Sequence, residues 1–144
     1  MAGSFTAENK ILPGAYLNFK TNAPLSITPG ERGIVVLLQE MSVGEVGDTY
    51  TITATDSSQY PVAATQADKL LVNEALKGAK TVIVYNLGTE HDAEVITGAL
   101  AELKTMVFNT LAYPYSGATY DANKLTIATW IEAMREDEGI KVQG

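Results

Sequence analysis

The chain has 144 residues, of which 46% are hydrophobic and 19% charged, which is typical of one globular domain with its own core. Its 17 acidic and 10 basic residues give a net charge of -7, which argues against nucleic acid as a partner because phosphate binding needs concentrated Lys and Arg. The absence of cysteine excludes disulfides and thiolate sites, and no apolar run approaches the about 20 residues that span a bilayer. The N-terminus lacks the layout of a signal peptide, so we expect assembly in the cytoplasm.

Residues 1–32 have the pattern of an N-terminal arm and linker. The stretch Ala15-Tyr16-Leu17-Asn18-Phe19-Lys20 predicts a short strand with polar side chains on one face and Leu17 and Phe19 on the other. The residues that interrupt the chain on either side of it are Pro13, Gly14, Pro24, Pro29 and Gly30. A two-sided strand between such joints has little of its own domain to pair with. We therefore expect its backbone to pair with the sheet edge of another subunit.

The rest of the chain, residues 33–144, reads as one α/β domain. Apolar or β-branched runs predict strands at 34–38, 49–55, 81–85 and 108–113. The alternating threonines of 49–55 indicate an edge strand, whereas 81–85 and 108–113 have the pattern of central strands. Helical spacing of apolar residues predicts helices at 65–77, 91–104 and 121–138.

The order of these elements predicts a mostly parallel or mixed sheet covered by about three helices, because strands that alternate with helices are joined by right-handed crossovers. In the last helix we expect Leu125, Ala128, Ile131 and Met134 to face inward. Residues 140–144 read as the opening of another strand. The chain therefore looks truncated in its last strand, and we take it to be part of a longer protein.

Few residues suggest chemistry. His91 is the only histidine, and it lies between two acidic residues where we expect polar side chains at a helix N-terminus rather than a metal or catalytic site. The turn Asn86–Thr89 follows a strand and precedes a helix, where α/β proteins bind ligands, but it lacks a phosphate-binding pattern. Tyr113-Pro114-Tyr115, with Tyr120 nearby, fits either a ligand pocket or a strand end packed against a helix, and we favour the packing interpretation. Trp130 is expected to pack against the sheet.

Several segments, in order and spacing, resemble contractile tail sheath proteins of phages and prophages of Gram-positive bacteria and of phage-tail-like bacteriocins. The first is Asn9-Lys10-Ile11-Leu12-Pro13-Gly14-Ala15-Tyr16-Leu17-Asn18-Phe19, followed by Gly30-Glu31-Arg32-Gly33-Ile34-Val35. The later ones are Leu76-Lys77-Gly78-Ala79-Lys80-Thr81-Val82-Ile83-Val84-Tyr85, Phe108-Asn109-Thr110-Leu111-Ala112-Tyr113-Pro114 and the helix around Trp130.

The resemblance implies a structural subunit without catalytic residues, metal or cofactor. Such subunits form hexameric rings stacked helically around a tail tube, donate terminal strands to neighbours, and contract when triggered at the baseplate, driving the tube through a cell envelope. Ala15–Lys20 would be the inter-subunit strand, and the Pro and Gly residues beside it would be the arm's hinges. The expected location is a virion tail or phage-tail-like particle, without nucleic-acid binding or membrane insertion. The family's sheath proteins are more than twice this long. Their C-terminal part, to which nothing in this sequence corresponds, supplies the acceptor strands.

Two other interpretations remain open from the residues alone. One is a small α/β ligand-binding module that uses the Asn86–Thr89 turn and the Tyr113-Pro114-Tyr115 segment. The other, which we favour least, is an enzyme that uses His91 as its base.

Overall fold

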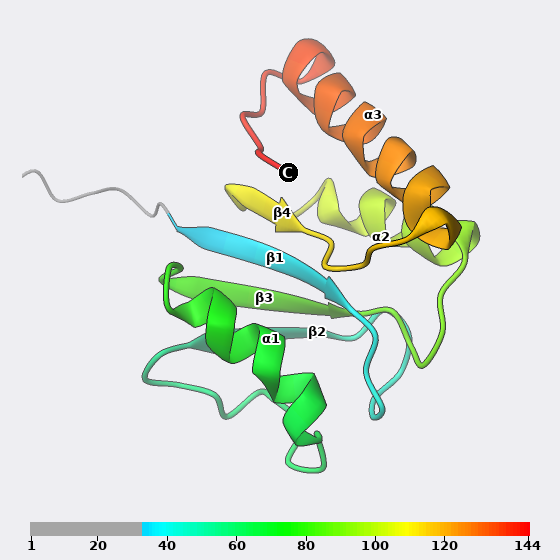
Figure 1. Cartoon of the computed structure of the whole chain (residues 1–144). Helices are drawn as coiled ribbons and strands as arrows, with labels where there is room; N and C mark the ends of the chain where they lie inside the picture. Colours follow the sequence, from blue (N-terminus) through cyan, green and yellow to red (C-terminus); the bar gives the residue numbers. More distant parts are fainter. Residues whose placement is uncertain (1–32) are drawn as a thin grey trace, which may run out of the picture.

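The structure is a computed structural model, which describes residues 33–144 (Figure 1). The predicted arm and linker, with the strand Ala15–Lys20 and the hinge residues Pro13, Gly14, Pro24, Pro29 and Gly30, lie outside the described residues. The described part contains one sheet with helices on both faces.

The sheet has four strands in the order β2-β3-β1-β4. They are β1 (Ile34–Gln39), β2 (Thr49–Thr53), β3 (Thr81–Asn86) and β4 (Thr110–Ala112). β1 pairs in parallel with both β3 and β4, whereas β2 pairs antiparallel with β3. The prediction of a mostly parallel or mixed sheet is therefore confirmed, as is the position of the threonine-rich strand at an edge.

Both faces of the sheet are buried, because successive side chains of a strand point to opposite sides. Val36 and Leu38 of β1 join a hydrophobic cluster with α2 (Ala93–Leu103) and α3 (Asp121–Asp137). Leu37, between them, joins a second cluster with Val72 of α1 (Gln66–Leu76). Helix α1 therefore covers one face, and α2 and α3 cover the other (Figure 1).

The helix starts follow from capping residues. Thr65 caps α1 in a capping box with Asp68, and the Asp92 carboxylate accepts hydrogen bonds from the backbone N–H groups of Glu94 and Val95 at the start of α2. A 3₁₀ turn (Ala118–Tyr120) leads into α3. All three predicted helices are present, with their ends within two residues of the prediction.

Two details of the prediction are wrong. Leu125 and Ala128 are exposed, and α3 instead buries Asn123, Ile127, Ile131 and Met134, a neighbouring helical stripe that shares two of its members with the predicted one. Strand β4 is not central but stands last in the sheet order, and it has only three residues. Residues 140–144, predicted to open another strand, do pair with β4, through a parallel bridge between Gln143 and Thr110.

Candidate functional site

The residues assigned to assembly from the sequence lie outside the described part, so the structure bears on the receiving side of strand donation. A donated strand needs a sheet edge whose backbone groups are free. The two edges of the described sheet are β2 and β4.

The outer edge of β2 is covered by the loop that follows it. Asn86 N–H donates to the carbonyl of Asp48. In an antiparallel pair the backbone groups of alternate residues point to opposite sides, so those of Tyr50 and Ile52 face β3 and those of Thr51 and Thr53 face away from it. Two of these outward amides have partners in the loop. Thr51 N–H donates to Gln59 Oε1 at 3.1 Å, and Thr53 N–H donates to the carbonyl of Asp56 at 2.8 Å. The loop therefore occupies groups that an incoming strand would need.

The outer edge of β4 is covered by the segment after α3. Leu111 N–H donates to the carbonyl of Gln143 at 2.7 Å, and Gln143 N–H donates to the carbonyl of Asn109 at 2.9 Å. The guanidinium of Arg135 donates from both Nε and Nη2 to the carbonyl of Val142, which is itself buried. These contacts hold the segment against β4, so this edge of the described sheet is also occupied.

A polar and aromatic network lies where the parallel strands end. Glu40 directly follows β1, Tyr113 directly follows β4, and His91 lies in the connection from β3 to α2. His91 Nδ1 is 2.6 Å from Glu40 Oε1, and His91 Nε2 is 2.6 Å from the hydroxyl oxygen of Tyr113. Because a carboxylate only accepts hydrogen bonds, Nδ1 donates to Glu40, and the second ring nitrogen is hydrogen-bonded to the Tyr113 hydroxyl.

Further tyrosines enclose the His91 ring. The Tyr120 ring stacks on it with centroids 5.5 Å apart and planes 17° from parallel, and Tyr115 lies 5.0 Å away. The Tyr115 hydroxyl also accepts a hydrogen bond from the backbone N–H of Glu40. Burial raises the pKa of Tyr115 to about 12, so its hydroxyl stays protonated at neutral pH. The network ties together β1, β4, the α2 start and the 3₁₀ turn.

This network has the residue types of an acid–base site, but its histidine is closed off from solvent. The His91 side chain is 0% exposed, and both ring nitrogens already have partners. His91 lies at the N-terminus of α2, as predicted, but its ring is packed inside and does not lie in a polar turn. The sequence signal that we missed is that three polar residues follow the carboxyl ends of neighbouring parallel strands. What the arrangement can do is fix these strand ends relative to one another.

The Asn86–Thr89 turn is also used internally. Asn86 is buried; its Nδ2 donates to the carbonyl of Val43 at 3.0 Å, and its Oδ1 accepts from Gly88 N–H at 2.8 Å. The carbonyl of Gly88 accepts from Met41 N–H at 2.9 Å. The groups that would have bound a ligand hold two loops together instead.

The described part of the chain contains no helix with the length and apolar character to cross a membrane. In the same residues, no group of three or more His, Asp or Glu side chains is placed to hold a metal ion.

Part of the chain matches a model of a known protein family. Residues 32–87, which run from the linker through β3, match the family model described as tail sheath protein Gp18 domain III N-terminal region. The match covers less than half of the chain and places these residues beside the tail sheath family. The resemblance drawn from the sequence is confirmed, and this family is a structural one.

Two curated relatives match nearly the whole chain, and one of them is named as a phage-like element protein. The phage-like element PBSX protein XkdK of Bacillus subtilis is 31% identical, and the uncharacterized protein YqbK of the same organism is 30% identical, in each case over 94% of this chain. The chain spans 31% of the length of each of these relatives.

Two solved structures share the fold. The sheath tail protein of Desulfitobacterium hafniense superposes with a TM-score of 0.65 at 23% identity, covering 90% of this chain and 52% of that protein. The sheath tail protein of Listeria innocua gives 0.64 at 18% identity, covering 81% and 48%. The domain described here therefore has the fold of sheath proteins.

Proposed function

We propose that this chain is part of a structural subunit of a contractile tail sheath. The subunit polymerises around a tail tube by donating the strand Ala15–Lys20 to a neighbouring subunit, and it contracts to drive the tube through a cell envelope. The observation that carries the proposal is the tail sheath match of residues 32–87, supported by the sheath fold of residues 33–144. The setting is a virion tail or phage-tail-like particle assembled in the bacterial cytoplasm. Its partners are its own copies in stacked hexameric rings, the tube and the baseplate.

The described domain is suited to act as a rigid body in such a movement. Its two hydrophobic clusters cover both faces of one sheet, and the His91 network fixes the strand ends. Movement would then be confined to the joints Pro13-Gly14 and Pro24 to Gly30. Contraction would be a switch between two packings of such bodies, while the donated strand keeps its backbone hydrogen bonds.

The edges of the sheet favour an acceptor elsewhere in the neighbouring subunit. The β2 edge is covered by its own loop and the β4 edge by Val142 and Gln143. A strand donated to either edge would have to displace these hydrogen bonds. We therefore place the acceptor outside residues 33–144, in a part of the full-length subunit to which this chain does not correspond.

The test removes the donor from the full-length protein. Deletion of residues 1–20 should abolish tube-like polymers seen by electron microscopy, while circular dichroism of the subunit stays unchanged. Single prolines at Leu17 and Asn18 make the same test more sharply, because proline removes a backbone donor and neighbouring residues donate to opposite sides of a strand. Leu17→Val is the matched control, since it keeps the N–H group. Normal polymers from the deletion and from both proline variants would rule out the donated strand.

A further inference from the structure

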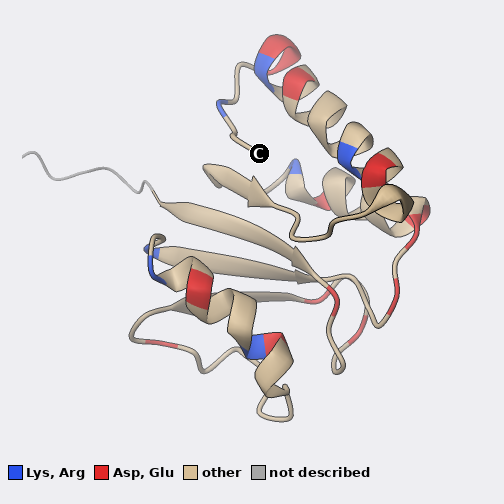
Figure 2. Ribbon diagram, in the orientation of Figure 1, with Lys and Arg blue, Asp and Glu red and all other residues tan. Residues whose placement is uncertain are grey.

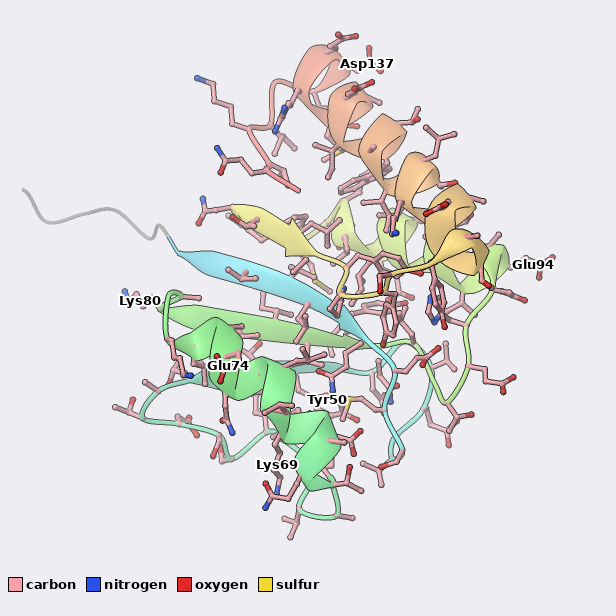
Figure 3. All side chains as sticks on the ribbon, in the orientation of Figure 1. Tyr50, Lys69, Glu74, Lys80, Glu94 and Asp137 are labelled. Carbon is pink, nitrogen blue, oxygen red and sulfur yellow. The ribbon has the colours of Figure 1, made fainter. Side chains whose placement is uncertain are left out.

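The two ends of the parallel strands differ in charge. Residues 33–144 contain 15 acidic and 7 basic residues, and the two kinds are not evenly spread. Figure 2 shows acidic loops at the right-hand edge, where the parallel strands end, and both lysines and acidic residues toward the left-hand edge, where they begin. In Figure 3 the labelled Glu94 and Lys80 mark these two edges. The end of the domain where the parallel strands finish is therefore acidic, whereas the end where they begin is mixed in charge.

The acidic edge is formed by two loops that contact each other. Residues 40–48 and 86–94 contain six acidic residues and no lysine or arginine. Five of the six are exposed: Glu45, Asp48, Glu90, Asp92 and Glu94. The loops are joined by hydrogen bonds from Met41 N–H to the carbonyl of Gly88 and from Gly47 N–H to the carbonyl of Asn86. Val46, in the middle of the first loop, is 56% exposed, which gives this edge an apolar tip among its carboxylates.

The edge where the parallel strands begin is hollowed. A cavity of about 890 Å³ lies where β1 and β4 begin; its lining includes Gly33, Asn109, Arg135 and Lys141 and, among residues 33–144, no acidic residue. Lys80 flanks it, since a Cβ atom on Gly33 would lie 3.7 Å from Lys80 Cβ. The side chains of Lys80 and Lys141 are exposed and make no ion pair within residues 33–144. Lys80 and Lys141 therefore lie at a concave surface without an ion-pair partner among residues 33–144, although Glu136, Asp137 and Glu138 follow Arg135 nearby.

We propose that the acidic loop Val43–Asp48 of one copy docks into the basic hollow of a second copy. The two surfaces lie at opposite ends of β1, whose six residues span about 20 Å, so the contact is head-to-tail and leaves one surface free on each copy. A heterologous contact of this kind does not close on itself and extends into a filament. The acidic loop attracts the basic hollow of another copy, whereas two acidic loops or two basic hollows repel each other. The charges therefore favour the head-to-tail orientation.

The contact deepens the proposed assembly function and rests on it, but it is separate from strand donation. The donated strand would supply backbone hydrogen bonds that salt affects little. The head-to-tail contact between exposed charges would weaken with salt, because the screening length falls from about 10 Å at 0.1 M to about 3 Å at 1 M. Residues 1–20 take no part in it.

Charge reversal on this chain tests the contact. One variant combines Glu45→Lys with Glu90→Lys, and the other combines Lys80→Glu with Lys141→Glu; none of these four side chains makes a hydrogen bond or ion pair within residues 33–144. Sedimentation velocity at 50 mM and 500 mM NaCl should show salt-sensitive association of the wild-type chain. Each variant alone should associate at least about tenfold more weakly at low salt. An equimolar mixture of the two variants should associate again, because each then presents the charge that the other lacks.

The control variant combines Glu74→Lys with Glu132→Lys, which changes the net charge as much as the first variant but lies on α1 and α3 outside both surfaces. It should associate like the wild type. The proposal is overturned if the wild-type chain stays monomeric at 100 μM and 50 mM NaCl, if either reversal leaves association unchanged, or if the mixture does not recover. Deletion of residues 1–20 should leave this association intact. A loss of strand donation and a loss of the head-to-tail contact can therefore be told apart.

Discussion

Replacement of His91 by alanine should strongly lower the free energy of unfolding. The side chain is 0% exposed, and its removal leaves Glu40 Oε1 and the Tyr113 hydroxyl without their 2.6 Å partners. A buried polar group that loses its partner costs about 1–3 kcal/mol, and the lost ring contacts with Tyr120 and Tyr115 add about 0.5–1.5 kcal/mol. Glu40 is partly exposed, so water replaces part of its loss. The expected destabilisation is about 2–4 kcal/mol, a large part of the stability of a small domain.

Urea unfolding followed by circular dichroism measures this change. The midpoint should fall while the slope stays unchanged, since the variant exposes the same surface on unfolding. Thr89→Ala is the matched control, because Thr89 is exposed in the same connection and its replacement should change stability by less than about 0.5 kcal/mol. A loss of less than about 0.5 kcal/mol for His91→Ala would show that the network does not hold the strand ends together.

Three further predictions concern other parts of the domain. Burial disfavours the charged form of Asp68, but hydrogen bonds from Ser42 and Thr65 outweigh this effect and lower the pKa of Asp68. The ionised carboxylate therefore stabilises the fold above the ordinary pKa of Asp, and this stabilisation is lost as the pH falls through the lowered pKa. Urea midpoints should thus fall more between pH 7 and pH 3 for the wild type than for Asp68→Asn, and equal falls would contradict this. Gly88 has φ +85°, and a Cβ there would lie 2.8 Å from Val46 Cγ2, so Gly88→Ala should lower the free energy of unfolding in urea by about 1–3 kcal/mol. Gly78→Ala is the control and should be nearly neutral, because a Cβ at Gly78 would have nothing within 4 Å. Equal effects of the two substitutions would refute the turn geometry. Ile127→Ala should cost about 2–4 kcal/mol in thermal unfolding and Leu125→Ala less than about 0.5 kcal/mol, and the reverse order would refute the inward face assigned to α3.

The sequence was sufficient to predict the regular elements. Strand β3 is a continuous apolar run, and helix α2 carries an apolar pattern of period 3.6; its Ile96, Ala99, Leu100 and Leu103 are buried as that pattern requires. The local pattern is enough to predict these two elements, because the apolar spacing and the intrinsic helix or strand preference of their residues indicate the same structure.

The buried face of α3 could not be predicted in the same way. The pattern contains two overlapping stripes, one through Leu125 and Ala128 and the other through Asn123 and Ile127, and both include Ile131 and Met134. Only the packing against α2 and the sheet decides between them. Tertiary contact thus selected the stripe that is less apolar at its start.

The His91 network was out of reach for a different reason. Its bonds join residues 51 and 22 positions apart, and no local pattern links them. The strand order would have indicated the site, since Glu40 and Tyr113 follow neighbouring strands, but that order is known only from the assembled sheet.

Hydrogen exchange in the arm tests the central claim most directly. In the full-length protein, peptides covering Ala15–Lys20 should exchange within seconds in the free subunit and at least about 100-fold more slowly in assembled polymers, because the donated strand gains its backbone partners only from a neighbour. Strong and equal protection in the free subunit and the polymer would show that this strand pairs within its own subunit, and would contradict assembly by strand donation.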